Sequence, residues 1–234
     1  MAHLFAAEGA RIGLIDRSAE GLADVCAQLV AQRVDERNFK QVCCDISDTR
    51  SLAAAVEQVR TSLGPIDIVI NNAGVSIPAP IDGSNYEEAW HTVLSVNLEA
   101  QANLIRHCLD DLSRRGDGRI VNIASTEGLG ATSYASPYTV SKHGVIGLTR
   151  SLAVELGNRG VTVNCVAPGP ILTGMTAEID DAAKAKFARR RVPLRRYGHP
   201  EEVAHAVLSL ALPASSYING AVLVVDGGLT AQNT

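Results

Sequence analysis

The sequence predicts an α/β fold: a doubly wound parallel sheet of the Rossmann-like type that lacks its first strand. Short apolar runs alternate with longer helical segments along the 234 residues, which is the order that places helices between parallel strands. The runs are nearly continuous in apolar residues, as is typical of strands covered on both faces. The chain has no internal repeat and no linker-like stretch, so residues 1–234 are expected to form a single domain.

The apolar pattern predicts the elements in order. Strands are expected at residues 11–15, 39–44, 66–70, 119–124, 161–167 and 221–225. Helices are expected at residues 19–32, 49–63, 86–112, 136–159 and 201–210. Residues 2–8 have the pattern of a helix tail, which Gly9 would close as a C-terminal cap. No strand precedes that short helix, whereas a doubly wound fold normally begins with one.

The composition excludes several classes of protein and site. The net charge is −4, so no nucleic-acid partner is expected, although the basic residues form one arginine cluster of Arg189, Arg190, Arg191, Arg195 and Arg196. No segment approaches the ~20 apolar residues of a membrane helix. The start of the chain, with Glu8, does not have the pattern of a signal peptide. The five cysteines form no Cys-x-x-Cys pair and the histidines no His-x-x-x-His spacing, so free thiols and no metal site are expected. We therefore expect a cytoplasmic protein.

Residues that follow the predicted strands are candidates for chemistry, because doubly wound sheets bind ligands at the carboxyl ends of their strands. Ser125 follows one strand, and Tyr138 and Lys142 lie four residues apart on one face of the next helix. An ammonium group within about 4–6 Å favours the phenolate and would lower the tyrosine pKa from its usual value near 10. Such a tyrosine could exchange a proton with an alcohol or a ketone. Taken singly, each of these residues could also be an ordinary cap or surface side chain.

The combination of motifs resembles the short-chain dehydrogenase/reductase family from about residue 2 to the C-terminus. The motifs that match in order and spacing are Asn71-Asn72-Ala73-Gly74, Asn97, Ser125, Tyr138-x-x-x-Lys142, Pro168-Gly169 and Val225-Asp226-Gly227-Gly228. The resemblance implies four catalytic residues. Tyr138 would be the general acid and base, Lys142 would lower its pKa and hold the nicotinamide ribose, Ser125 would orient the substrate carbonyl, and Asn97 would hold a water in the proton relay.

The same resemblance implies a nicotinamide cofactor. Asp16 would accept hydrogen bonds from the adenosine ribose and repel a 2′-phosphate, which favours NAD over NADP, although the neighbouring Arg17 keeps NADP in consideration. A helix cap is the alternative role for Asp16. The remaining cofactor-binding residues are expected to be Asp45 and Ile46 at the adenine, Asn72, Ala73 and Gly74 on the adenosine side, Tyr138, Lys142, Pro168 and Gly169, and Ile171 and Thr173 at the carboxamide and pyrophosphate. Asp48 and Asp67 are assigned to structure.

The family's first strand and its glycine-rich loop, of order 20 residues, are missing before the first helix. Three explanations compete: the working protein is longer and Met1 is internal, the chain is a truncated form that binds cofactor poorly, or the strands on either side pair and close the gap. Unpaired buried ladder groups would cost roughly 1–3 kcal/mol each.

Three functions are expected to compete. The first is NAD(H)-dependent interconversion of a small-molecule secondary alcohol and a ketone. The second is NADPH-dependent reduction of a 3-oxoacyl thioester, and the third is a non-enzymatic subunit. The family's usual assembly implies a homotetramer that uses the C-terminal stretch 217–228. Residues 173–191 correspond to a substrate lid, and the arginines at its end are expected to form a solvated face or to bind an acidic substrate.

Overall fold

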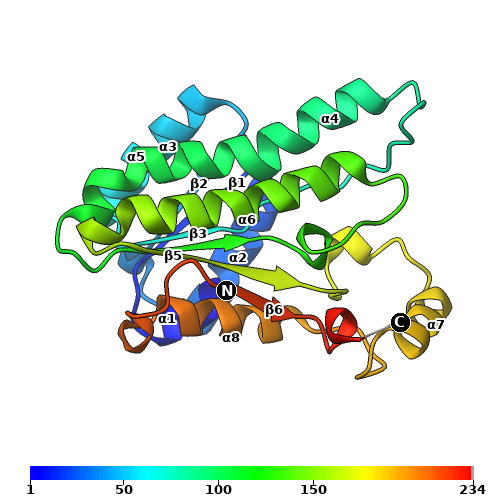
Figure 1. The fold of residues 1–234 in the computed structure, drawn as a ribbon. Coiled ribbons are helices and arrows are strands. Elements are labelled where there is room, and N and C mark those ends of the chain that lie inside the picture. Colours follow the sequence, from blue (N-terminus) through cyan, green and yellow to red (C-terminus); the bar gives the residue numbers. More distant parts are fainter. Residues whose placement is uncertain (233–234) are drawn as a thin grey trace.

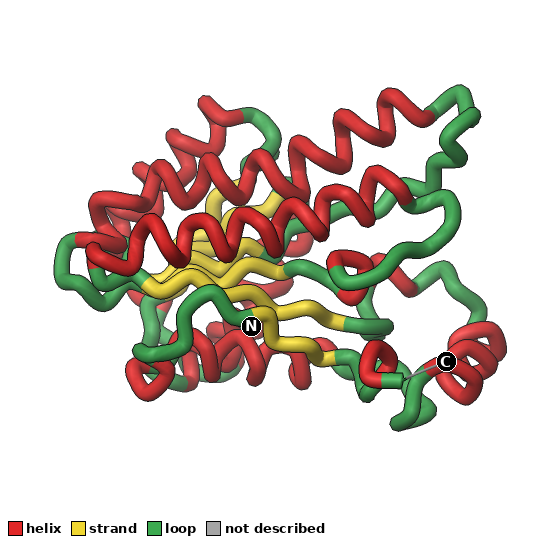
Figure 2. The backbone as a smooth tube through the Cα atoms, viewed as in Figure 1, coloured by secondary structure: helices red, strands yellow, loops and turns green. Residues whose placement is uncertain are grey.

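The computed structural model describes residues 1–232 and confirms the predicted α/β architecture. All strand pairings are parallel. One sheet pairs β1 (Ile12–Asp16) with β2 (Phe39–Cys43). The other has the order β3-β4-β5-β6, formed by β3 (Ile68–Asn71), β4 (Arg119–Ile123), β5 (Thr162–Pro168) and β6 (Val222–Val225). The strands lie between two layers of helices (Figures 1 and 2).

The helices cover both faces of the strands, as a doubly wound fold requires. One layer contains α3 (Thr49–Leu63), α4 (Tyr86–Leu94), α5 (Ala100–Ser113) and α6 (Ser136–Leu156) (Figure 1). The other contains α1 (Ala2–Ala7), α2 (Ala19–Ala31) and α8 (Pro200–Ala211). A last helix, α7 (Asp181–Arg191), lies beyond the carboxyl ends of the strands (Figure 1).

Strand β4 shows why the apolar runs are continuous. All five of its residues are buried. Ile120 packs in a cluster with Val163 on the side of α5 and α6, and Val121 packs with Val207 of α8 on the other side. A strand that contributes to two hydrophobic clusters needs apolar side chains at successive positions. The continuous apolar run that predicted this strand is therefore explained by helices packing on both of its faces.

The capping residues explain where several helices begin and end. Ser18 accepts a hydrogen bond from the Gly21 amide at 3.0 Å and begins α2. Asp48 accepts from two amides at the start of α3, which confirms its structural assignment. Gly9 follows α1 with a φ of 81°, as its predicted capping role requires. Gly160 ends the turn after α6 at a φ of 72°, and a Cβ there would lie 2.3 Å from the Gly116 carbonyl oxygen.

The prediction of one helix over residues 86–112 was wrong in detail. Helix α4 ends at Leu94, a π-helical turn spans Ser95–Glu99, and α5 begins at Ala100. Asn97 lies inside this turn, and its side-chain amide makes two hydrogen bonds to the backbone of Val75. The extra residue of a π turn reorients the helix locally. The irregularity therefore places Asn97 against the loop that follows β3.

The two sheets share side-chain packing but no ladder. Within residues 1–232, no backbone pairing joins β1 to β3, so the proposed closure of the gap by these strands does not occur. Ile12 of β1 nevertheless packs in the same cluster as Ile68 and Ile70 of β3, together with Phe5 of α1. Apolar contacts between side chains thus connect the two sheets on this face.

Candidate functional site

The predicted catalytic residues meet where β4 and β5 end and α6 begins. Ser125 follows β4, and its neighbour Ala124 donates to the Val166 carbonyl of β5 at 2.8 Å. Helix α6 begins at Ser136 with Pro137 in its first turn, a position that suits proline because its missing N–H is not needed there. Tyr138 and Lys142 therefore project from the first two turns of α6 beside the end of the sheet.

Lys142 is held by the sheet rather than by solvent. Its side chain is buried, with 3% of the residue exposed, and Nζ donates to the Ile123 carbonyl oxygen at 2.8 Å. Nζ lies 5.5 Å from the centroid of the Tyr138 ring. An ammonium group has three donors, and the only protein hydrogen bond from Nζ within residues 1–232 is the one to Ile123. Lys142 can therefore serve a ligand and the tyrosine together.

The expected direction of the Tyr138 pKa was wrong for the protein alone. Burial raises the pKa of Tyr138, the Ser125 hydroxyl lowers it in part, and the charge of Glu127 raises it further. Burial also lowers the pKa of Lys142 to about 8. The reason is that desolvation disfavours both charged forms, while Nζ is directed at the Ile123 carbonyl. The neutral phenol is thus the favoured form of Tyr138.

The Ser125 hydroxyl has a defined orientation. Its oxygen accepts a hydrogen bond from the Glu127 amide at 3.1 Å, in the 3₁₀ turn Thr126–Gly128. That bond uses an acceptor position and leaves the hydroxyl proton available for a substrate oxygen. The turn can approach α6 closely because residue 128 is glycine, where a Cβ would lie 2.7 Å from the Lys142 carbonyl oxygen.

Asn97 joins the loop after β3 to helix α6. Oδ1 accepts from the Val75 amide at 2.8 Å, and Nδ2 donates to the Val75 carbonyl at 2.9 Å and to the Ser141 hydroxyl at 3.1 Å. Ser141 in turn donates to the Tyr138 carbonyl at 2.7 Å. Both Nδ2 protons are used within the protein, and one acceptor position on Oδ1 remains. The proposed water relay at Asn97 stays a prediction.

The predicted adenosine-binding residues gather at the ends of β1 and β2. Oδ1 of Asp16 accepts from the Ser18 amide at 2.8 Å, and the helix that follows is capped by Ser18 instead. Asp16 is therefore exposed without a capping role. The Asp16 carbonyl accepts from the Cys44 amide at 2.9 Å, which brings Asp45 alongside. Hydrogen bonds from Ser47 lower the pKa of Asp45, so the Asp45 carboxylate is ionised at neutral pH.

The residues after β3 lie nearer the predicted catalytic residues than the adenosine assignment implied. A Cβ placed on Gly74 would lie 3.3 Å from Oδ1 of Asn97 and 3.6 Å from Nζ of Lys142. Asn72 is exposed, and Ala73 is half-buried. This segment is therefore open to a ligand that also reaches Lys142.

The residues after β5 have mixed roles. Gly169 packs so tightly that a Cβ there would lie 2.7 Å from the Asp226 Cβ, and Pro168 is half-buried beside it. The Ile171 side chain is buried in the core, so only its backbone could face a cofactor. Thr173 is exposed, and its amide donates to the Thr176 hydroxyl at 3.1 Å. These contacts fix the course of the segment that leads to α7.

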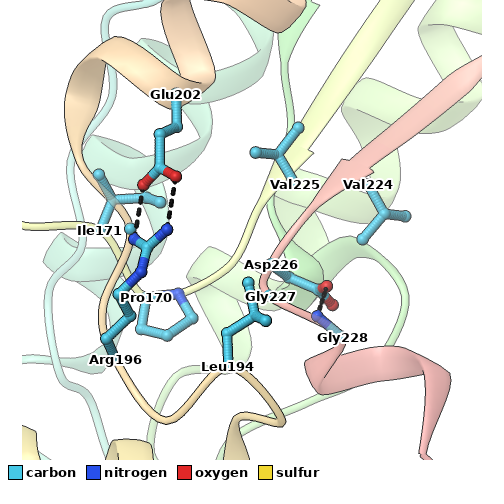
Figure 3. A pocket seen from close by; sticks show the side chains of 11 residues that line it. Pro170, Ile171, Leu194, Arg196, Glu202, Val224, Val225, Asp226, Gly227 and Gly228 are labelled. Atoms are coloured by element: carbon cyan, nitrogen blue, oxygen red, sulfur yellow. Dashed lines mark hydrogen bonds and ion pairs between the residues drawn. The ribbon is translucent and has the colours of Figure 1, made fainter.

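A separate pocket of about 260 Å³ lies beside the end of β6 and does not include the predicted catalytic residues (Figure 3). Arg196 and Glu202 form a two-pronged ion pair along its wall, with distances of 2.7 and 2.6 Å. Arg196 of the arginine cluster is thus engaged in structure, whereas Arg189, Arg190 and Arg191 are exposed at the end of α7. Asp67 likewise has a structural role, as it pairs with arginines after α5.

Sequence reasoning missed three residues at this site. Glu127, Thr139 and Ser141 all contact the first turns of α6 or the Ser125 turn. The only sequence signal was their closeness to Ser125 and Tyr138 along the chain.

The other expectations can be checked in the described part of the chain. Residues 1–232 contain no group of three or more His, Cys, Asp or Glu side chains that could hold a metal ion. No helix among them is both long enough and apolar enough to span a bilayer. All five cysteines are free thiols.

Comparisons with known proteins find relatives that are named as dehydrogenases or reductases. The family profile described as enoyl-(acyl carrier protein) reductase matches residues 1–230. The chain is 36% identical over 230 residues to a D-threitol dehydrogenase of Mycolicibacterium smegmatis, covering 98% of this chain and 87% of the relative. It is 37% identical over 228 residues to a 3-oxoacyl-[acyl-carrier-protein] reductase of Thermotoga maritima, covering 97% and 90%.

Solved structures are similar over nearly the whole chain. A gluconate 5-dehydrogenase from Burkholderia cenocepacia in complex with NADP and tartrate superposes with a TM-score of 0.90 at 31% identity, covering 99% of this chain and 90% of that one. A levodione reductase superposes with a TM-score of 0.91 at 34% identity, covering 98% and 92%.

Proposed function

The chain belongs to the short-chain dehydrogenase/reductase family, whose members are oxidoreductases acting on CH–OH groups, and we propose that it interconverts a secondary alcohol and a ketone with NAD as the preferred cofactor. The observation on which the proposal rests is the pairing of Tyr138 with the buried ammonium of Lys142, 5.5 Å from its ring, beside Ser125. This arrangement supplies a proton donor, a nearby positive charge and a donor for the substrate oxygen.

The described residues suit a nicotinamide cofactor. The exposed Asp16 can accept ribose hydroxyls, the segment 72–74 lies open beside Lys142, and Nζ of Lys142 has donors to spare. Asp45, Ile46 and the backbone of Ile171 would complete the contacts together with Thr173. When bound, the nicotinamide supplies the hydride acceptor or donor.

The protein's own residues handle the proton and the substrate oxygen. In reduction, the neutral phenol of Tyr138 donates its proton to the ketone oxygen as that oxygen gains negative charge. The Ser125 hydroxyl donates a hydrogen bond to the same oxygen, since the bond that it accepts from the Glu127 amide does not use the hydroxyl proton. The ammonium of Lys142 stabilises the phenolate that remains. In oxidation the proton moves in the opposite direction.

The preference for NAD rests on Asp16. A carboxylate at the ribose would repel a 2′-phosphate, whereas the exposed Arg17 would attract one. The gluconate 5-dehydrogenase that resembles this chain was solved with NADP. Steady-state rates with both cofactors decide the point, and a lower kcat/KM for NAD than for NADP would refute the preference.

Reduction of a 3-oxoacyl thioester is the second candidate. Relatives at 35–37% identity bear the name 3-oxoacyl-[acyl-carrier-protein] reductase, and the family profile is described as enoyl-(acyl carrier protein) reductase, which also names an acyl carrier protein substrate. A preference for NADPH together with turnover of a 3-oxoacyl thioester would favour this function. Calorimetric titration with NAD addresses the third candidate, since binding in the micromolar range would exclude a non-enzymatic subunit.

A homotetramer is proposed as the assembly. The edge strand β6 and its surroundings expose apolar side chains, including Tyr217, Ile218, Leu223 and Val154. Exposed apolar patches of this kind commonly form subunit contacts. Free cysteines throughout suit a reducing compartment such as the cytoplasm. Light scattering of the purified chain tests the oligomeric state.

The assigned role of Tyr138 is tested with Tyr138→Phe. Loss of the proton donor should lower kcat/KM by roughly 10²- to 10⁴-fold. Tyr134→Phe is the matched control, because Tyr134 is 68% exposed. Equal activity in both variants would refute the assignment.

A further inference from the structure

Glu127 lies beside the proposed catalytic residues, and its side chain has no part in the mechanism above. Its amide donates to Ser125 Oγ, and the turn that contains it packs directly on the backbone of α6 at Lys142. The residue is half-buried. Its carboxylate is therefore fixed within the same small region as the phenol of Tyr138.

The Glu127 carboxylate contacts two other segments of the chain. Oε1 accepts from the Thr132 hydroxyl at 2.7 Å, in the loop between the Ser125 turn and α6. Oε2 accepts from the Thr139 hydroxyl at 3.1 Å, in the first turn of α6, and Thr139 directly follows Tyr138. One side chain thus ties the loop and the Tyr138 turn to the Ser125 turn.

The charge of this carboxylate is not neutralised by an ion pair. Among residues 1–232, no Lys, Arg or His side chain lies within 4.0 Å of the Glu127 carboxylate. Near Tyr138, Lys142 donates to the Ile123 carbonyl, and the exposed His143 makes its hydrogen bond to the Thr139 carbonyl. A nearby negative charge disfavours a phenolate, and after burial, which raises the pKa of Tyr138, and the Ser125 hydroxyl, which lowers it, the charge of Glu127 raises it further.

We propose that Glu127 is a positioning residue that clamps the Tyr138 turn through its hydrogen bonds to Thr132 and Thr139. Its negative charge also destabilises the phenolate form of Tyr138 by electrostatic repulsion. The inference rests on the proposed role of Tyr138 as proton donor. A neutral phenol is the form that donates a proton, so the charge of Glu127 would hold the site ready for reduction. Lys142 would supply the opposing charge once the proton has left.

The test is a direct titration of Tyr138 in the full chain, which needs no substrate. With tyrosine labelled by ¹³C at Cζ, the Tyr138 resonance is identified by its loss in Tyr138→Phe. Glu127→Gln removes the charge at nearly constant shape and should lower the Tyr138 pKa on the order of one unit. The double variant Thr132→Val/Thr139→Val keeps the charge but removes both hydroxyls, so the Tyr138 pKa should not fall.

Hydrogen exchange tests the clamp separately. Amides of residues 129–139 should exchange on the order of tenfold faster in the threonine double variant, while those of α5 keep the wild-type rate. An unchanged exchange rate in residues 129–139 would overturn the clamp. An unchanged Tyr138 pKa in Glu127→Gln, or an equal fall in the threonine variant, would overturn the electrostatic role. Turnover in Tyr138→Phe would instead count against the proposed function, and the titration would remain interpretable.

Discussion

Gly128 offers a sharp test of how closely the Ser125 turn must approach α6. Substitution by alanine would place Cβ 2.7 Å from the Lys142 carbonyl oxygen and 2.8 Å from Ile146 Cδ1. An ordinary contact begins at 3.4 Å, so the turn must retreat by about 0.7 Å unless α6 itself moves. The Ile146 side chain can adjust, but the carbonyl belongs to the helix backbone. The strain of such overpacking is typically about 1–3 kcal/mol.

The retreat would move Ser125 with the turn, because the Glu127 amide is bonded to its hydroxyl. A displacement approaching 1 Å in a reacting geometry costs up to about 10²-fold in rate. We therefore expect Gly128→Ala to lower kcat/KM roughly 10- to 100-fold and to lower the free energy of unfolding in urea. Gly130→Ala is the control two residues away, where the nearest atom to the new Cβ is the Thr126 carbonyl oxygen at 3.9 Å. If the two variants have the same activity and stability, the close approach is not required and the reasoning fails.

Two further predictions concern buried polar groups. Burial lowers the pKa of Lys142 from 10.5 to about 8, so between these values the unfolded chain binds a proton that the folded chain does not. The free energy of unfolding should then rise with pH across this window, by about 3 kcal/mol relative to Lys142→Met, in urea titrations at pH 7.5 and 10.5. Parallel pH profiles of the two proteins would contradict this. Asn97→Ala leaves the Val75 amide and carbonyl without their partner and should cost on the order of 3 kcal/mol of stability. Asn103→Ala, which loses a 3.3 Å bond near the surface, should change stability little, and a similar loss in both would refute the role of Asn97.

The sequence predicted the fold because its strongest signals are local. Strands β4 and β5 are buried on both faces, and this coverage appears directly as continuous apolar runs. The spacing of Tyr138 and Lys142 needs only a regular helix to bring both side chains to one face. The caps at Gly9 and Asp48 likewise depend on neighbouring residues alone.

Features that depend on distant partners were not predicted. The π turn at Asn97 interrupts an unbroken apolar pattern, and its contacts are to Val75, 22 residues earlier in the chain. The direction of the Tyr138 pKa follows from burial, which spacing does not reveal. Glu127 could be recognised only once folding had brought Thr132 and Thr139 to its two oxygens.

The division of the strands into two separately bonded sheets has a thermodynamic consequence. Asp16 lies at the end of β1 in one sheet, whereas Ser125 follows β4 of the other sheet and Lys142 of α6 donates to the Ile123 carbonyl of β4. Among the described residues 1–232, side-chain packing without a backbone ladder couples β1 to β3, so the β1–β2 unit should open as a foldon of its own, with a lower free energy than the four-stranded sheet. A ligand that contacts Asp16 and Lys142 at once would then bridge the two sheets. Its binding free energy would add to the free energy needed to open the β1–β2 unit. At saturating ligand, the two sheets should therefore unfold together in one cooperative transition.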